Sequence, residues 1–303
     1  MINNFIFMPV KEEKTVNNKI YVFDRDNVDR NIDLQLVDGF GDEWTKFNQF
    51  TDKELDNLYQ QYFDVLKPNI ININSVIADF GCGTGRFSNY FIDKVAHIDL
   101  IDPSHAIYVA EKYLGDNKHC RFLKTSIGAL PIQDETYDFA MSIGVLHHIP
   151  NTEQALRNCV LKVKKGGNFY LYLYYNLDKA NLILKFLFYI SSILRLIISR
   201  LPYWLKSFVC DLIAIFIYWP LARISTILTK INLKNIIKHL PLNFYYDKTF
   251  KIMRNDALDR FGTTLEKRYS KKEMEEMMVK AGLVDIQFSN SAPYWHAIGR
   301  RQF

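Results

Sequence analysis

A glycine-rich turn at residues 81–85, directly after a short apolar run, constrains the fold of this chain more than any other feature. The run at 76–80 predicts a buried strand, and the stretch from Arg86 to Ile92 has a helical pattern. Glycine has no Cβ, so Gly81, Gly83 and Gly85 let the backbone approach a ligand closely. The free N–H groups of the following helix would point at the same ligand. A small-molecule site after this strand is therefore predicted.

The spacing of these glycines differs from that of a dinucleotide-binding turn. A dinucleotide fingerprint has the form G-x-G-x-x-G, whereas this turn has the form G-x-G-x-G. Arg86 stands where the third glycine of that fingerprint would be. That glycine allows close packing of helix on strand, so a bulky arginine there argues against NAD as the ligand.

Asp102 follows the next expected strand, about twenty residues after the glycine turn, which is the spacing of a ribose-binding acid. Its carboxylate could accept hydrogen bonds from both ribose hydroxyls. The simpler interpretation is a turn residue or N-cap of the helix that follows. The glycine turn at this distance favours the ligand interpretation.

Short apolar runs alternate with amphipathic helical patterns through much of the chain. This alternation predicts an α/β fold with a mostly parallel, seven-stranded sheet and helices on both faces. Besides 76–80, strands are expected at 97–101, 121–124, 137–143, 168–174, 284–289 and 294–300. Helices are expected at 52–66 with Thr51 as N-cap, at 104–114, at 151–163 up to Gly166 and Gly167, and after Ser270.

Four segments follow from these patterns. Residues 1–70 form a lead-in without a glycine-rich or catalytic signature, and residues 71–178 form the ligand-binding core. Residues 179–269 form a hydrophobic, basic helical insertion between the fifth strand and the last helix. Residues 270–303 supply that helix and the closing strand pair.

Charge is distributed unevenly, although the net charge of the whole chain is only +5. From Lys179 to Lys251, eleven lysines and arginines stand against Asp211 and Asp247, a net charge of +9, so the rest of the chain carries −4. Such asymmetry indicates a local anionic partner, either a membrane surface or a phosphorylated substrate.

The cysteines indicate a reducing compartment. Cys82, Cys120, Cys159 and Cys210 show no metal-binding spacing, which is typical of scattered thiols in a cytosolic protein. No cluster of acids and histidines predicts a metal site. The apolar stretch at 1–10 lacks a basic region and a cleavage site, so no signal peptide is expected.

Five motifs in a fixed order carry a family resemblance. The chain resembles class I (Rossmann-like) S-adenosylmethionine-dependent methyltransferases, and more loosely those found among bacterial surface-polysaccharide enzymes. The resemblance covers residues 75–176, with residues 271–300 similar to the family's closing helix and strand pair. The motifs are Asp79-Phe-Gly-Cys-Gly-Thr-Gly85, Asp102-Pro-Ser104, Leu130-Pro131 with Tyr137-Asp138, Gly144-Val-Leu-His-His-Ile-Pro150 and Lys162-Val-Lys-Lys-Gly-Gly167.

The resemblance implies S-adenosyl-L-methionine as cofactor and assigns roles around the first two motifs. The three glycines of the turn would face the methionine portion of the cofactor. Asp79 would help to anchor its amino group, and Asp102 would hold the ribose.

The resemblance also implies contacts after the third and fourth strands. Ser126 stands where the family usually has an acid that contacts the adenine amino group, and a hydroxyl accepts that bond more weakly. Ile127 would pack on the adenine. Gly144 and Val145 would lie close to the methionine chain and the methyl group.

His147 and His148 are candidates for a catalytic base. They follow the fourth strand, near the expected site of methyl transfer, and a histidine has a suitable pKa for proton removal. The alternative is a structural turn that closes the pocket by hydrogen bonds. Since the sulfonium of the cofactor already activates the methyl group, the family's in-line displacement requires no metal.

A polar and aromatic cluster precedes the last helix and includes Arg268 and Tyr269. Arginines beside tyrosines suit an acceptor that carries phosphate or carboxylate groups, such as a sugar derivative. An ordinary hydrogen-bonded rim is the alternative for each residue.

Two intensely apolar runs, 182–198 and 205–224, dominate the insertion. Lys185 and Arg195 interrupt the first run, while Asp211 and Pro220 interrupt the second, so transmembrane helices are not expected. A helical lid over the substrate entrance, a membrane-surface element and an oligomer interface remain open. In the first two cases lysines and arginines should point outward.

Three functions are consistent with these patterns. The first is methyl transfer to a small-molecule or glycan acceptor, most readily to an oxygen. The second is methyl transfer to a lipid-linked or quinone-type substrate at the membrane surface. The third is a non-catalytic cofactor-binding scaffold. A nucleic-acid partner is disfavoured because the basic segment is apolar. The expected location is the cytoplasm, with peripheral binding at the inner membrane face as a further option.

Overall fold

The computed structural model describes residues 5–23, 29–46, 51–176, 182–233, 240–291 and 293–302. The chain divides into two compact units. One, here called the core unit, comprises Met1–Asn176 and Leu265–Phe303, and the other, the helical unit, comprises Leu177–Thr264.

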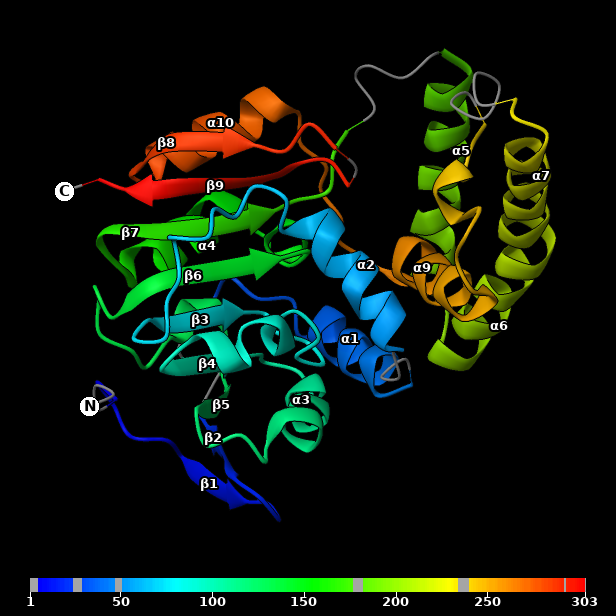
Figure 1. Cartoon of the computed structure of the whole chain (residues 1–303). Helices are drawn as coiled ribbons and strands as arrows, with labels where there is room; N and C mark the ends of the chain where they lie inside the picture. Colours follow the sequence, from blue (N-terminus) through cyan, green and yellow to red (C-terminus); the bar gives the residue numbers. More distant parts are fainter. Residues whose placement is uncertain are drawn as a thin grey trace. The chain divides into compact units, whose positions relative to one another are not determined.

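A mostly parallel sheet forms the centre of the core unit (Figure 1). Its strands are ordered β1-β2-β5-β4-β3-β6-β7-β9-β8, with β1–β2, β7–β9 and β9–β8 antiparallel and the other pairs parallel. The strands are β1 (Lys11–Lys14), β2 (Lys19–Val22), β3 (Val76–Phe80), β4 (His97–Ile101), β5 (Cys120–Lys124), β6 (Tyr137–Ile143), β7 (Val163–Tyr172), β8 (Leu283–Phe288) and β9 (His296–Arg301). The predicted α/β, Rossmann-like sheet is confirmed, but it has nine strands instead of seven, because the lead-in adds β1 and β2.

The strand order reverses at β3. The chain passes from β3 outward through β4 and β5, then returns to the other side of β3 with β6 and β7. Ligands of open α/β sheets bind at such a reversal, beyond the carboxyl ends of the strands. The glycine turn follows β3, and Gly144 follows β6. The topology therefore places two predicted ligand-binding turns on neighbouring strands.

Both faces of the sheet are buried. Along β3, Ile77 belongs to one apolar cluster, whereas Ala78 and Phe80 belong to the other. On β4, the neighbouring side chains of Leu100 and Ile101 likewise belong to different clusters. Side chains alternate between the two faces of a strand, so a continuous apolar run requires cover on both sides. Helices provide that cover, as predicted.

Five α-helices belong to the core unit: α1 (Leu34–Lys46), α2 (Asp52–Tyr62), α3 (Ala106–Leu114), α4 (Thr152–Leu161) and α10 (Lys271–Lys280). The predicted N-caps are confirmed. Thr51 and Glu54 form a reciprocal capping box at α2, and Ser270 forms the same motif at α10.

Two local predictions about the core unit are wrong. Residues 86–92 form no α-helix but the 3₁₀ turns η1 (Ser88–Tyr90) and η2 (Ile92–Lys94). The Arg86 carbonyl, which would accept the Tyr90 amide in an α-helix, accepts the Tyr59 hydroxyl at 2.8 Å instead. The glycines at 166 and 167 lie inside β7, where the pairing with β6 changes register, and do not separate helix from strand.

The helical unit contains α5 (Leu182–Ile198), α6 (Tyr203–Ile213), a π-turn η5 (Ala214–Tyr218), α7 (Trp219–Lys230), the short turn η6 (Asn243–Tyr245) and α9 (Phe250–Gly262). Helix α6, η5 and α7 form one continuous helix of 28 residues, Tyr203–Lys230. Asp211 and Pro220, which interrupt the apolar run in the sequence, do not interrupt this helix. A π-turn directly precedes the Trp219–Pro220 step, where proline cannot supply a helical N–H, and Asp211 is paired with Arg254.

By length and composition alone, Tyr203–Lys230 could cross a membrane, and within the described ranges no second helix meets the same criteria. Helices buried in the cores of water-soluble proteins also meet them. In this helix, however, only 22% of an apolar stretch of 18 residues is buried.

Candidate active site

The backbone of the glycine turn has a conformation that requires glycine. Gly81, Gly83 and Gly85 all have positive φ, at 81°, 54° and 77°. A Cβ on Gly81 would lie 2.4 Å from Val145, and one on Gly85 would lie 2.8 Å from Leu114. Two of the three glycines are therefore needed for packing as well as for backbone conformation.

Gly83 differs, because a Cβ there would meet only the Trp44 indole, at 3.9 Å. Its amide donates to Asp102 Oδ2 at 2.9 Å. The other carboxylate oxygen of Asp102 accepts from the Ser104 amide at 2.8 Å and the Ser104 hydroxyl at 2.6 Å. The structure thus joins the glycine turn to the predicted ribose acid. Asp102 thus also has the turn role weighed above. Its Oδ1 already accepts two bonds, whereas Oδ2 accepts the Gly83 amide and can accept a second bond.

Asp79 is a buried acid directly before the turn, and it accepts the Ser88 hydroxyl at 2.6 Å. Burial raises the pKa of Asp79 to about 7, with a further contribution from the Asp102 charge, while the Ser88 hydrogen bond opposes the shift. A nearby ammonium group would favour the charged form of this carboxyl. Asp79 therefore fits the predicted partner of the cofactor's amino group.

Two buried hydroxyls near the predicted cofactor positions lack partners. Thr84 Oγ1, in the glycine turn, and Ser126 Oγ, after β5, have no hydrogen bond within the part of the chain that the structure describes. Buried hydroxyls are usually satisfied, so both are available to a bound ligand. Ile127 is buried and opens the 3₁₀ turn η3 (Ile127–Ala129). These groups fit a site for a nucleoside-containing cofactor.

The turn after β6 lies against the glycine turn. Gly144 has a φ of 75°, and its amide donates to the Tyr172 carbonyl at 3.1 Å. Val145 fills the space that a Cβ on Gly81 would need. Gly144 and Val145 therefore lie beside the predicted methionine-binding segment, as expected from the strand order.

His147 is fully buried, with its ring centroid 4.1 Å from that of His148 and 3.9 Å from that of Tyr174. Neither ring nitrogen has a partner among the described residues. Burial, aided by the charges of His148 and Arg268, lowers the pKa of His147 well below the ordinary range. The imidazole is therefore neutral at physiological pH and can accept a hydrogen bond from a hydroxyl, while the same surroundings make it a weaker base than an exposed histidine.

His148 has a different environment. Its Nδ1 donates to the Leu265 carbonyl at 2.8 Å, and its ring contacts Phe40 at a centroid distance of 4.8 Å. These contacts favour a structural role for His148 in closing the turn. His147 remains the candidate for the catalytic base.

Arg268 adds a buried cation beside this pair. It donates to Glu266 at 2.8 Å and to the Tyr175 carbonyl at 3.2 Å, with its guanidinium carbon 5.2 Å from the Tyr174 ring centroid. Burial opposes the charge, but the Glu266 carboxylate outweighs it and raises the pKa of Arg268. Of the expected rim cluster, Lys267 donates its amide to the His147 carbonyl at 3.0 Å, and the charge of Arg268 acts on the His147 imidazole.

The lead-in supplies residues that the sequence motifs did not predict. The Arg86 guanidinium lies 4.5 Å from the Trp44 ring of α1, next to Gly83. Asp29, from the same lead-in, accepts the Gly128 amide at 3.0 Å, directly after Ser126 and Ile127. These contacts cross long sequence separations. No motif of the lead-in predicted them.

Residues 78–171 match a family model described as a methyltransferase domain. That range contains every predicted cofactor and base residue, in the expected order. The chain contains a class I S-adenosylmethionine-dependent methyltransferase domain. Its cofactor is S-adenosylmethionine, and the turns after β3, β4, β5 and β6 provide the groups that fit it.

Proteins similar to this methyltransferase domain are named for different substrates. The chain is 30% identical over 98 residues to the sterol 4-C-methyltransferase of Caenorhabditis elegans, covering 31% of this chain and 29% of that protein. It is 30% identical over 103 residues to the tRNA (carboxymethyluridine(34)-5-O)-methyltransferase of Saccharomyces cerevisiae, covering 33% and 36%. The chain thus spans about a third of the length of these curated relatives.

One solved structure similar to this chain is human N-acetylserotonin methyltransferase in complex with S-adenosylmethionine. The TM-score is 0.48 at 11% identity, covering 87% of this chain and 57% of that one.

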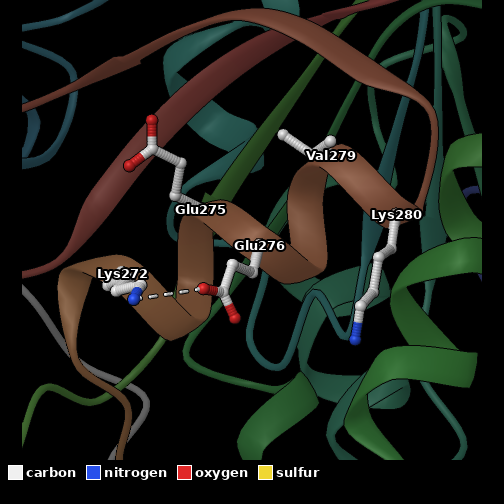
Figure 2. A pocket seen from close by; sticks show the side chains of 5 residues that line it. All are labelled: Lys272, Glu275, Glu276, Val279 and Lys280. Atoms are coloured by element: carbon white, nitrogen blue, oxygen red, sulfur yellow. Dashed lines mark ion pairs between the residues drawn. The ribbon is translucent and has the colours of Figure 1, made fainter.

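A hollow of about 440 Å³ lies along α10, lined by Lys272, Glu275, Glu276, Val279 and Lys280 (Figure 2). Its Lys272–Glu276 ion pair, at 3.8 Å, joins two exposed side chains of one helix. None of the predicted site residues lines this hollow. Within the described ranges, no three His, Cys, Asp or Glu side chains gather closely enough to hold a metal.

Proposed function

We propose that the protein transfers a methyl group from S-adenosylmethionine to an oxygen of a small-molecule or glycan acceptor. The bound cofactor supplies a methyl group already activated by its sulfonium. The domain must then align the acceptor with that methyl group and remove the hydroxyl proton.

The observation that carries this proposal is the state of His147. It follows the Gly144–Val145 turn, it is neutral, and both of its ring nitrogens lack partners in the described structure. In the proposed reaction the acceptor oxygen forms a bond to the methyl carbon while the carbon–sulfur bond breaks. The electron pair of that bond stays on sulfur, and the hydroxyl proton passes to His147. A hydroxyl needs such a base, which favours oxygen as the acceptor atom.

Arg268 supports an acceptor with a negative charge. Its guanidinium is buried near Tyr174 and His147, where an arginine can bind phosphate or carboxylate through two hydrogen bonds. A phosphorylated sugar or a lipid-linked glycan has both a hydroxyl and an anionic group.

The test is a screen with the purified full chain and S-adenosylmethionine that carries a deuterated methyl group. Sugar nucleotides, lipid-linked glycans, quinone precursors and tRNA serve as acceptors, and mass spectrometry reads the added methyl. We expect transfer to a glycan-containing acceptor, and less transfer with Asp102→Ala at the same concentration of S-adenosylmethionine. tRNA is included because one relative is named for it. Exclusive methylation of tRNA, or of carbon, would replace the proposal.

A lipid-linked or quinone-type acceptor is the second candidate. The exposed apolar surface of the helical unit favours it, since such a surface would bring the domain to its substrate in a membrane. If S-adenosylhomocysteine binds but no acceptor in the screen is methylated, the non-catalytic scaffold becomes the better explanation.

We place the domain in the cytoplasm, or at the cytoplasmic face of a membrane. Cys82, Cys120, Cys159 and Cys210 are all free and buried, which suits a reducing compartment. Fractionation of cells that express the tagged full chain tests this placement, and recovery from an extracytoplasmic fraction would overturn it.

A further inference from the structure

The helical unit directs large apolar side chains outward. Trp204 is 71% exposed and Phe216 is 72% exposed on the continuous helix Tyr203–Lys230. Helix α5 has the same character. The exposed apolar residues of these helices are Leu182, Phe186, Leu187, Tyr189, Ile190, Ile193, Leu194, Leu196, Ile197, Trp204, Phe208, Leu212, Ile215, Phe216, Ile217, Trp219, Ile224 and Ile227. A helix of a protein surrounded by water normally buries this stripe.

The inner surface of the unit contains many small side chains. Buried positions on α6, η5 and α7 include Cys210, Ala214, Ala222 and Ser225, and α9 contributes Ala257. Small residues at helix contacts allow close approach of the backbones. This composition is common where helices associate in lipid, because large apolar residues gain little there by facing one another.

Two cations of the apolar helices bind backbone carbonyls within the unit, whereas lysines and arginines were expected to face outward. Arg195 of α5 donates to the Thr263 and Thr264 carbonyls, both at 3.1 Å. Lys206 of α6 donates to the Gly262 carbonyl at 2.9 Å. Both cations thereby stabilise the carboxyl end of α9, where the helix dipole is negative.

Asp211, an acidic residue of the Tyr203–Lys230 helix, forms an ion pair within the unit. Asp211 of α6 accepts two hydrogen bonds from Arg254 of α9, at 2.8 and 2.6 Å. Arg260 of α9 donates to the hydroxyls of Ser191 and Ser192 on α5, both at 3.0 Å. Ionisable groups in membrane-embedded helices follow this rule, facing the bundle interior and binding one another or backbone carbonyls.

Other cations near the helix ends are exposed. Lys185 lies in the first turn of α5, Arg200 follows its last turn, and Lys230 ends α7. Lysines and arginines at such positions can reach the headgroup region of a bilayer while apolar residues between them contact acyl chains.

We propose that the helical unit is embedded in the hydrocarbon of a phospholipid bilayer through α5 and the Tyr203–Lys230 helix. The length of the longer helix supports a bilayer as its surroundings. About twenty apolar residues span the hydrocarbon of a bilayer, and the apolar helix Tyr203–Lys230 has 28 residues in all. Charge supports it as well. The +9 of residues 179–251 suits anionic headgroups, and the pairing of Asp211 with Arg254 lowers the cost of bringing both charges close to hydrocarbon. The inference goes beyond the proposed function and holds for any acceptor.

The first test is flotation of the purified full chain with vesicles of phosphatidylcholine and phosphatidylglycerol. After mixing, the vesicles are washed with 1 M salt and with alkaline carbonate. Embedding predicts that the protein stays with the vesicles through both washes. Release by salt would show electrostatic adsorption only and overturn the proposal. A protein that stays in solution as a monomer or as a dimer would also overturn it, because the apolar faces would then contact the core unit or a second copy.

A matched pair of variants tests the surface itself. Trp204→Glu combined with Phe216→Glu should lower the fraction that resists washing by roughly tenfold or more, because charges would enter hydrocarbon. Ile73→Glu, at an exposed apolar position of the core unit, should leave that fraction unchanged. Retained binding of S-adenosylhomocysteine shows that each variant is folded, and keeps failure of embedding distinct from failure of catalysis. An unchanged fraction in the double variant would contradict the proposal.

Fluorescence gives a second, independent measurement. Replacing Trp44 and Trp295 by phenylalanine leaves Trp204 and Trp219 as the tryptophans of the chain. Their emission should be quenched strongly by lipids with brominated acyl chains and weakly by acrylamide in water. The reverse order would place these indoles outside the hydrocarbon.

Discussion

The imidazole of His147 lies 3.9 Å from the ring of Tyr174, centroid to centroid, and its two nitrogens find no hydrogen-bond partner among the described residues. The contact joins the turn after β6 to the segment that follows β7, with the two ring planes inclined by 33°. A buried, neutral base packed against another ring has a low energetic cost of reorganisation before proton transfer. The chemistry of the domain is therefore expected to depend on His147 more than on its neighbour His148.

Replacing His147 should impair the chemical step selectively. His147→Ala should lower kcat by roughly a hundredfold or more, because the acceptor hydroxyl would lose its base. The affinity for S-adenosylhomocysteine, measured by calorimetry, should change little. His148→Asn is the matched control and should keep most of the activity, since an amide can still donate to the Leu265 carbonyl. Near-normal turnover in both variants would assign the pair a purely structural role.

The pH dependence of the same reaction provides a separate test. Because burial lowers the pKa of His147, its active, unprotonated form should persist to lower pH than that of an ordinary histidine. The rate of methyl transfer should therefore show no acidic limb in the range where exposed histidines titrate. A limb in that range that disappears in His147→Ala would contradict the assignment of a depressed pKa.

Asp102 should contribute to cofactor affinity through two routes. Its carboxylate is expected to bind the ribose, and it also holds the Gly83 amide and the Ser104 turn. Asp102→Ala should weaken S-adenosylhomocysteine binding by about 1–3 kcal/mol. Asp285→Ala, which removes an exposed carboxylate paired with Arg300, is the control and should bind normally. Tight NAD binding by the unaltered protein, without binding of S-adenosylhomocysteine, would refute the cofactor assignment.

The strands of the core were predictable because they are buried on both faces. Predicted and observed bounds coincide for β3, β4 and β6, whose continuous apolar runs leave little choice. Strand β1 escaped prediction because its sequence, Lys-Glu-Glu-Lys, has no apolar pattern and lies at an exposed sheet edge. The turns after residue 86 escaped because the hydroxyl of Tyr59 comes from another helix.

Some residues of the candidate site could be predicted from the sequence, and others could not. Glycines and acids at strand ends are visible in sequence, because their spacing follows from the strand–turn–helix pattern. Contacts of Trp44 and Asp29 with this region depend on where the lead-in packs, which no local pattern encodes. The direction of the Arg195 and Lys206 side chains was unpredictable for the same reason, since both bind carbonyls at the end of the distant helix α9.

Asp79 should release a proton when the cofactor binds. Its pKa of about 7 in the free protein leaves it partly protonated at neutral pH, and a nearby ammonium group should favour the carboxylate. Calorimetry at pH 7 in buffers of different ionisation enthalpy should therefore detect a fraction of a proton released per S-adenosylhomocysteine bound. Asp79→Asn should abolish that release and weaken binding. Equal apparent enthalpies in all buffers, with the unaltered protein, would be evidence against a titrating Asp79.

Asp99 should make the stability of the core unit depend on acid pH. It is fully buried on β4, and it accepts hydrogen bonds from His97 at 2.8 Å, from Arg121 at 2.7 and 2.6 Å and from Tyr137 at 2.6 Å. Burial by itself would raise the pKa of Asp99. The hydrogen bonds from His97 and Arg121 outweigh burial and lower the pKa from 3.8 to about 2.

The direction of the pH effect follows from that shift. An acid with a lowered pKa in the folded state stabilises the fold above its unfolded pKa, and this contribution is lost as the pH falls from about 4 to about 2. It amounts to about 2 kcal/mol. Urea unfolding of the full chain, followed by circular dichroism at pH 7 and pH 3, should show part of this loss. Asp99→Asn should be less stable at pH 7 because Arg121 loses its carboxylate, and it should be less sensitive to acid. Asp285→Asn, at an exposed ion pair, is the control and should behave like the unaltered protein at both pH values. If Asp99→Asn lost as much stability in acid as the unaltered protein, other carboxyl groups would dominate the effect.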